Sequence, residues 1–160
     1  MELRTVGDSG LRVSRTGLGT ITWGRETDAR TAVGLLGRFA DAGGTLIDTA
    51  PAYGGGAAES FIGRYLAQRP RDSLVLMSKA GFDIRQGQPV VDTSRSALLS
   101  ALRGSLKRMR TDYIDIWQLH AHLQLRRLAN GSGGDVAKGA TWAYPHRQYA
   151  GRVFLARTTG

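Results

Sequence analysis

Cysteine is absent from the 160-residue sequence, so the chain can form neither a disulfide framework nor a thiolate zinc site. Long apolar runs are also absent, and none reaches the length that a transmembrane helix needs. The start of the chain, residues 1–4, lacks the apolar core of a signal peptide. We therefore expect a cytoplasmic protein with no membrane partner.

Acidic residues are scarce in one part of the chain and ordinary in the rest. Up to His120 both signs of charge are mixed, whereas beyond it Asp135 is the only acid. The bases beyond His120 are Arg126, Arg127, Lys138, Arg147, Arg152 and Arg157. The net charge of +9 partly reflects this uneven end. Because no recognition motif or aromatic platform accompanies the charge, we expect no nucleic-acid partner.

Apolar periodicity predicts strands and helices in alternation over the first three quarters of the chain. Two short strands around a glycine-bounded turn, within 2–6 and 11–15, form a predicted β-hairpin. Helical spacing then predicts helices over 28–42, 58–68 and 94–110, and Leu18 is a candidate strand residue. Apolar runs predict strands over 45–48, 73–78 and 113–120, with a loop over 81–92. This order is typical of parallel βαβ units in one domain.

Residues 44–54 hold the densest combination of strand and turn signals. The run from Thr45 to Ile47 fits a buried strand, and Asp48 comes where that strand ends. Pro51 and three glycines after Tyr53 then force an irregular loop. An acid at a strand end and a tyrosine on the next loop are both placed to project into a site.

Three polar residues end three different predicted strands: Asp48, Lys79 and His120. In a barrel of βα units the active site lies on the face where the strands end. A tyrosine hydroxyl loses its proton only near about pH 10, and a neighbouring cation favours that loss. Tyr53 with a lysine beside it is therefore a candidate proton donor to a carbonyl. None of these side chains can supply a hydride, so the chemistry requires a cofactor.

The motifs at 10–14, 17–20, 47–54, 78–79 and 112–120 occur in the order and spacing of a known family. With them the chain resembles the N-terminal half of an aldo-keto reductase, over residues 1–122. The resemblance implies an α/β fold: a partial TIM (β/α)8 barrel of the first four βα units, with an N-terminal β-hairpin across its bottom. Residues 123–160 do not continue the resemblance, and we expect an irregular, non-homologous tail there.

The resemblance implies NADPH-dependent reduction of aldehyde or ketone carbonyls of small molecules, without a metal. It assigns the general acid to Tyr53, its activation to Lys79 and the carbonyl-orienting contact to His120. Asp48 pairs with Lys79 in this scheme. The residues implied to meet the nicotinamide end of the cofactor are Gly19, Thr20 and Asp48, and Trp23 is implied to wall the substrate pocket.

A complete TIM barrel typically needs about 250 residues, so this chain is short for the family. One interpretation is a frameshift or truncation near His122, which would make the chain an impaired fragment. Four strands would also leave two barrel edges open, and open edges favour self-association.

Two other functions are compatible with the same residues. The scaffold could serve a non-catalytic protein that senses a cofactor or binds a partner, because a fold does not fix a function. Alternatively, one residue separates His120 from His122, so both imidazoles would point the same way from a strand end. Metal-dependent barrel hydrolases use such pairs as metal ligands.

Overall fold

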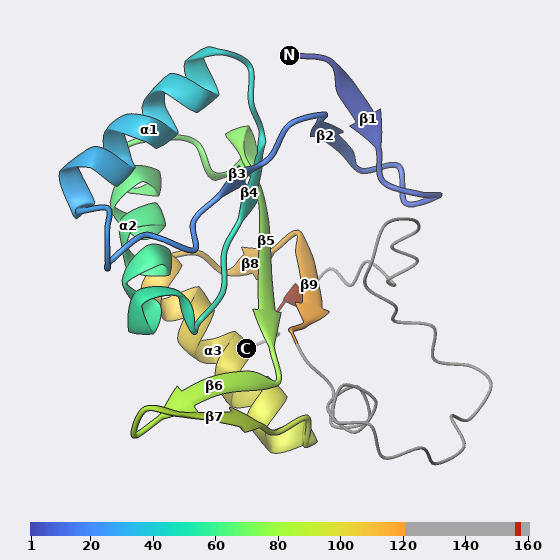
Figure 1. The fold of residues 1–160 in the computed structure, drawn as a ribbon. Helices are drawn as coiled ribbons and strands as arrows, with labels where there is room; N and C mark the ends of the chain where they lie inside the picture. The colour runs from blue at the N-terminus through green and yellow to red at the C-terminus, as the bar shows by residue number, and fades with distance from the viewer. Residues whose placement is uncertain (121–155, 158–160) are drawn as a thin grey trace, which may run out of the picture.

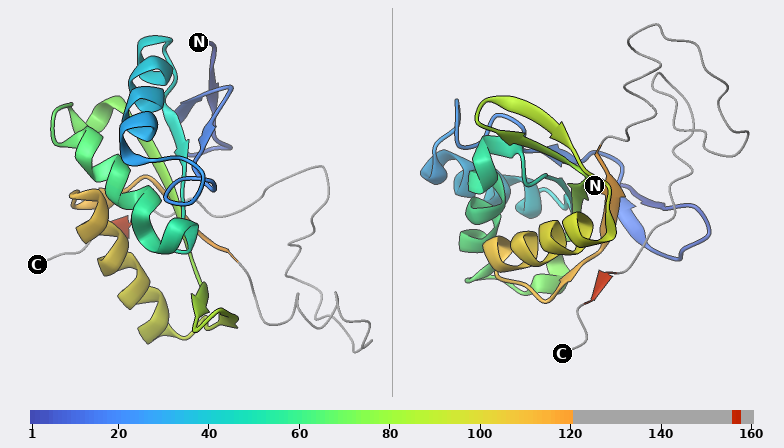
Figure 2. Two further views of the ribbon diagram at one scale, coloured as in Figure 1. Left: turned by 60° about the vertical axis from the view of Figure 1, so that its left-hand side comes forward. Right: turned by 90° about the horizontal axis from the view of Figure 1, so that it is seen from below.

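A parallel sheet lies at the centre of the computed structural model, which describes residues 1–120 and 156–157. The sheet comprises β3 (Leu18–Gly19), β4 (Leu46–Asp48), β5 (Val75–Ala80) and β9 (Ile116–Leu119), side by side in that order. The helices are α1 (Ala29–Asp41), α2 (Ala57–Leu66) and α3 (Arg95–Met109). All three helices lie on one face of the sheet (Figures 1 and 2). The alternation of strands and helices predicted from the apolar pattern is therefore present.

The register of the sheet aligns the strand ends that carry the polar residues. Asp48 of β4 pairs with Gly19 on one side and with Met77 on the other. Lys79 of β5 pairs with Gln118 of β9. Because the strands are parallel, their C-terminal ends lie at the same edge of the sheet.

The core lies between the sheet and the three helices. Ile47 and Leu76 are each 0% exposed on the helix-facing side of the sheet. Apolar residues of the three helices supply the other side of this core. Its fully buried helical members are Ala32, Leu36, Ala58, Ile62 and Met109.

Local capping sets the starts of two helices close to where the sequence predicts them. The Asp28 carboxylate accepts a 2.8 Å hydrogen bond from the Thr31 N–H and begins α1. The Ser94 hydroxyl accepts from the Ala97 N–H at 3.3 Å and begins α3. Such side chains replace a hydrogen bond that the first helical turn lacks.

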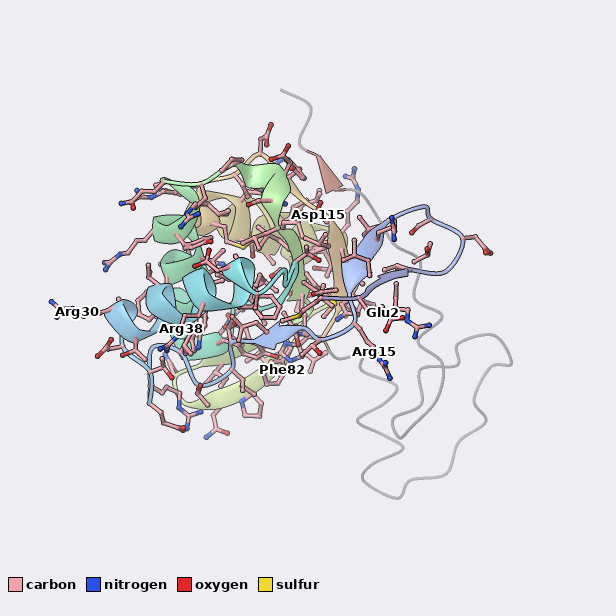
Figure 3. The ribbon with its side chains drawn as sticks, turned by 90° about the horizontal axis from the view of Figure 1, so that it is seen from above. Glu2, Arg15, Arg30, Arg38, Phe82 and Asp115 are labelled. Atoms are coloured by element: carbon pink, nitrogen blue, oxygen red, sulfur yellow. The ribbon has the colours of Figure 1, made fainter. Side chains whose placement is uncertain are left out.

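The predicted N-terminal hairpin is confirmed, with β1 (Leu3–Thr5) antiparallel to β2 (Arg12–Ser14). The Ser14 hydroxyl accepts from the N–H groups of Thr45 and Leu46 at 2.9 and 3.2 Å. These bonds fasten the hairpin to the start of β4, away from the polar strand ends. The Glu2 carboxylate pairs with Arg4 and Arg15 on the exposed side of the hairpin (Figure 3).

The segment predicted as a loop over 81–92 is instead a second hairpin. Strand β6 (Phe82–Arg85) runs antiparallel to β7 (Gln88–Val91), beyond the end of β5 (Figure 1). Its turn places Gln86 at a φ of 51° and Gly87 at 76°. Positive φ at both central residues suits the right-handed twist of a tight hairpin. Glycine and proline in this short segment conceal its strand alternation.

The single strand predicted over 113–120 is divided into β8 (Tyr113–Ile114) and β9. The break falls at Asp115, whose carboxylate accepts from the Leu76 N–H at 2.8 Å. Strand β9 joins the parallel sheet, whereas β8 pairs with β10 (Ala156–Arg157). Strand β10 lies within the segment predicted as an irregular tail. The rest of that predicted tail falls outside the described residues.

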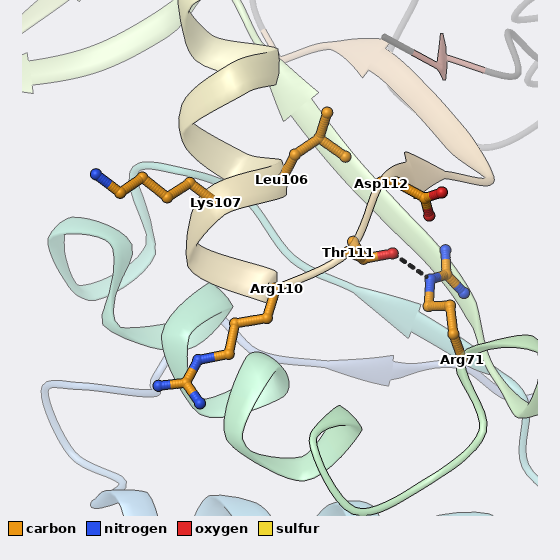
Figure 4. A pocket seen from close by; sticks show the side chains of 6 residues that line it. All are labelled: Arg71, Leu106, Lys107, Arg110, Thr111 and Asp112. Atoms are coloured by element: carbon orange, nitrogen blue, oxygen red, sulfur yellow. Dashed lines mark hydrogen bonds between the residues drawn. The ribbon is translucent and has the colours of Figure 1, made fainter. Parts of the chain in front are cut away.

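An ion pair joins Asp115 to the short 3-10 helix η2 (Arg71–Ser73) before β5. The distance from Arg71 Nη2 to Asp115 Oδ2 is 2.5 Å, and these side chains are 16% and 13% exposed. Arg71 also donates to the Leu74 carbonyl at 2.7 Å and to the Thr111 hydroxyl at 3.0 Å (Figure 4). This largely buried arginine therefore links the starts of two neighbouring strands.

Asp115→Ala is expected to lower the free energy of unfolding by about 3 kcal/mol or more, because it leaves the buried Arg71 charge without its partner. Asp115→Asn should cost less, since its amide oxygen can still accept from the Leu76 N–H. Urea denaturation measures both changes. Asp83→Ala breaks the exposed pair with Arg85 and serves as the control, with a change below about 0.5 kcal/mol. Equal losses in Asp115→Ala and the control would contradict a stabilising role for the buried pair.

Candidate active site

Lys79 lies at the centre of the polar cluster at the strand ends. Its ammonium group donates to the Asp48 carboxylate, to the Thr49 carbonyl at 3.1 Å and to the Tyr53 hydroxyl at 3.0 Å. The side chain is 10% exposed. A buried ammonium is stable only when its charge is paired and its protons are hydrogen-bonded, and Lys79 meets both conditions. Lys79 thereby brings Asp48 and Tyr53 together at the strand ends.

Tyr53 begins the 3-10 helix η1 (Tyr53–Gly56), which leads into α2. The next three residues, Gly54, Gly55 and Gly56, have φ values of 57°, 62° and 92°. A Cβ atom on Gly54 would lie 2.3 Å from the Trp23 carbonyl oxygen. Only glycine accommodates both this backbone and this contact. The glycines after Tyr53 therefore let the turn carry the hydroxyl to Lys79.

Asp48 ends β4 with its carboxylate 35% exposed and paired with Lys79. Its backbone carbonyl accepts from both the N–H and the hydroxyl of Thr20, each at 3.0 Å. These two bonds fix the strand end next to β3 and leave the carboxylate free to pair with Lys79.

His120 follows β9, and its N–H donates to the Ala80 carbonyl at 2.8 Å. Its ring lies edge-on to Tyr53, with centroids 5.8 Å apart. Burial lowers the pKa of His120 below 6.5, the Lys79 charge lowers it further, and Asp48 acts in the opposite direction. Nδ1 is buried without a hydrogen-bond partner among the described residues. A neutral imidazole is therefore the favoured form near pH 7.

The residues predicted to meet a cofactor differ in what they expose. Gly19 is exposed, and a Cβ atom built on it would meet nothing within 4 Å. Thr20 is 0% exposed, with its hydroxyl committed to Asp48. Gly19 therefore offers accessible backbone beside Asp48. Thr20 is buried and stabilises the same strand end through its hydrogen bonds to the Asp48 carbonyl.

Trp23, which is predicted to wall a substrate pocket, is buried in the structure. It is 2% exposed and belongs to the hydrophobic core between sheet and helices. Tyr53 packs against the same core. In this structure Trp23 is therefore a core residue beneath the site, and a direct contact with substrate remains a prediction.

Phe82 is the site residue that sequence reasoning missed. Its ring centroid lies 5.2 Å from that of His120. Phe82 also lines a 740 Å³ cleft together with Pro51, Gly55 and residues of α3. No local signal marks Phe82, because the contact depends on the hairpin that the sequence pattern conceals. Asp48, Tyr53, Lys79 and His120 line neither this cleft nor a 530 Å³ surface pocket beside Arg71 and Arg110 (Figure 4).

Metal ligands do not gather within the described part of the chain, where no group of three such side chains could hold an ion. His122, which the hydrolase alternative requires, lies outside the described residues. The described helices also include none long and apolar enough to cross a membrane.

A family model described as the Aldo/keto reductase family matches residues 15–124 of the sequence. The chain belongs to the aldo/keto reductase family. The match contains all four clustered residues, Asp48, Tyr53, Lys79 and His120. The resemblance predicted from the short motifs is therefore confirmed.

Curated relatives of this aldo/keto reductase chain carry names of more than one kind. Aldo-keto reductase YhdN of Bacillus subtilis is 38% identical in an alignment of 126 residues, which covers 75% of this chain and 38% of that protein. A probable voltage-gated potassium channel subunit beta of Oryza sativa is 37% identical in an alignment of 122 residues, which covers 75% of this chain and 37% of that protein.

Solved aldo-keto reductases share the described fold. A putative aldo-keto reductase from Pseudomonas aeruginosa has a TM-score of 0.70 and 37% identity, covering 81% of this chain and 51% of that one. An aldo-keto reductase of Bacillus halodurans, in a holo form, has a TM-score of 0.71 and 33% identity, with coverages of 81% and 43%. These neighbours are TIM barrels, which confirms the predicted partial barrel. The chain spans about half or less of the length of these relatives.

His120 is expected to make the stability of this aldo/keto reductase chain depend on pH. Because its pKa is lowered on folding, protonation favours the unfolded chain. Its contribution is complete above pH 6.5 and is lost as pH falls through the pKa of the folded chain. Urea denaturation at about pH 7.5 and about pH 5 measures the loss, and His120→Gln should reduce it. An equal loss in His120→Gln would contradict a burial-lowered pKa.

Proposed function

We propose that the protein is an NADPH-dependent oxidoreductase that reduces aldehyde or ketone carbonyls of small molecules to alcohols. The observation that supports this most directly is the Lys79 ammonium, which hydrogen-bonds both the Asp48 carboxylate and the Tyr53 hydroxyl. A proton donor held beside a paired cation is suited to general acid catalysis. Family membership supports the same reaction class.

In this proposal Tyr53 gives its proton to the carbonyl oxygen of the substrate. The Lys79 charge, 3.0 Å from the hydroxyl, stabilises the phenolate that remains. Asp48 pairs with the buried Lys79, and its carboxylate compensates for the water that the ammonium has lost. The phenolate then regains a proton from solvent before the next turnover.

His120 orients the substrate carbonyl in the same scheme. A neutral imidazole has one N–H to donate and does not compete with Tyr53 as an acid. The lowered pKa of His120 and its edge-on contact with Tyr53 support this division of roles. The residue therefore fixes where the oxygen lies relative to the tyrosine hydroxyl.

The residues present fit the reactive end of NADPH. Open backbone at Gly19 lies beside the partly exposed Asp48 carboxylate, which is paired with Lys79. Gly19 and Asp48 would hold that end of the cofactor, with Thr20 supporting the backbone. When bound, NADPH supplies the hydride that no side chain of the cluster can supply.

A non-catalytic role is the second candidate, as a protein that senses a cofactor or binds a partner. The observation that favours it is the similarity to a probable potassium channel subunit beta. A cofactor sensor and a reductase both require NADPH binding, whereas only the reductase predicts carbonyl turnover. Self-association through the outer edges of β3 and β9, which have no neighbouring strand among the described residues, is compatible with either.

Tyr53→Phe is expected to lower the rate of carbonyl reduction by roughly a hundred- to ten-thousand-fold, because it removes the general acid. Its NADPH affinity should change far less than the rate, since the proposed cofactor contacts lie at Gly19 and Asp48 and not at the Tyr53 hydroxyl. Turnover is measured by NADPH absorbance with a panel of aldehydes and ketones. Binding is measured by nucleotide fluorescence together with thermal stability.

Tyr65→Phe is the matched control, because it removes a tyrosine hydroxyl from α2, remote from Lys79, and should leave turnover unchanged. NADPH binding without turnover by the parent chain would favour the non-catalytic role. Turnover that survives Tyr53→Phe would contradict the proposed mechanism.

A further inference from the structure

Glu59 is a fully buried carboxylate that the proposed chemistry does not use. It lies in the first turn of α2 and is 0% exposed. One carboxylate oxygen accepts from the Ser78 hydroxyl at 2.8 Å, and the other accepts from Arg108 Nε at 2.7 Å. Because a buried charge costs free energy unless it is paired and hydrogen-bonded, these two donors make the position possible. Glu59 thus joins α2, β5 and α3 at one point.

The two segments that carry the proton donor and its cation meet at this carboxylate. Tyr53 begins η1, and η1 runs directly into α2. Ser78 directly precedes Lys79 on β5, and its side chain points to the helix side, opposite to that of Lys79. The Glu59–Ser78 bond therefore links the turn that carries Tyr53 to the strand that carries Lys79.

Arg108 holds the same turn from its outer side. A Cβ atom on Gly56 would lie 2.8 Å from Arg108 Cδ, so the arginine side chain packs directly over the Gly56 backbone. Its guanidinium then reaches Glu59. The turn formed by residues 54–56 therefore lies between the Arg108 side chain and the core, and this packing restricts its movement away from β5.

We propose that Glu59 is a positioning residue, which acts through Ser78 and Arg108 to keep the Tyr53 hydroxyl within hydrogen-bond distance of the Lys79 ammonium. The catalytic importance of this role rests on the proposed function. The positional role itself rests only on the contacts around Glu59, and it can be tested without turnover. A merely structural ion pair would stabilise the fold without affecting the Tyr53–Lys79 bond in particular.

The ammonium signal of Lys79 in ¹H–¹⁵N spectra provides the test, in the full chain labelled with ¹⁵N-lysine. The chain has only two other lysines, Lys107 and Lys138, and Lys79→Met assigns the signal. Because its three acceptors protect it, the Lys79 ammonium should exchange slowly with water in the parent chain. Ser78→Ala and Glu59→Gln should each speed that exchange by about fivefold, the effect of weakening one hydrogen bond.

Ser14→Ala is the matched control, because Ser14 is also a buried, hydrogen-bonded serine but contacts the opposite end of β4 from Asp48. It should lower thermal stability and leave the Lys79 exchange rate unchanged. If Glu59→Gln does not fold, Ser78→Ala decides, since it retains the Glu59–Arg108 pair.

Unchanged exchange in Ser78→Ala would overturn the positioning role. Equal acceleration in Ser14→Ala would also overturn it, because the signal would then report general stability. Carbonyl turnover is measured separately on the same samples. If the parent chain shows a protected Lys79 signal but no turnover, the proposed function is contradicted and the positioning role is not.

Discussion

The buried ammonium of Lys79 is the constraint on which the rest of the site depends. A charge that is 10% exposed needs a counter-ion and acceptors for its protons, and Asp48, Thr49 and Tyr53 supply them. These partners come from the end of β4 and the turn that follows it. Meeting the needs of one cation therefore fixes the relative positions of a strand end and a turn, and with them the proposed proton donor.

The parallel sheet makes that arrangement possible. Its register brings Asp48 and Lys79 to the same edge, while alternation within β5 sends Ser78 to the helix side. The two faces of the strand therefore play different parts, since Lys79 serves the site and Ser78 fastens α2 through Glu59. At the other end of the sheet the Arg71–Asp115 pair fastens β5 to the start of β9. Ion pairs thus hold both ends of a sheet whose middle is apolar.

Strand-end reasoning predicted Asp48, Tyr53, Lys79 and His120 from sequence, because parallel strands must bring their C-terminal ends together. Helix boundaries at Asp28 and Ser94 were predictable for the same kind of reason, since capping is local. The features that sequence could not predict depend on contacts distant in the chain. Phe82 meets His120 only because residues 82–91 form a hairpin, and the strand break follows from the bond between Asp115 and Leu76. In the sequence Glu59 resembles an ordinary exposed helical acid, and only the folded contacts with Ser78 and Arg108 show that it is buried.

A double-mutant cycle between Asp48 and Lys79 tests the central claim most directly. The free energy of unfolding is measured for the parent chain, Asp48→Asn, Lys79→Met and the double variant. Because the two groups form one buried pair, we expect a favourable coupling of about 1 kcal/mol or more. Additive changes, with a coupling near zero, would contradict the claim that the buried ammonium organises the site.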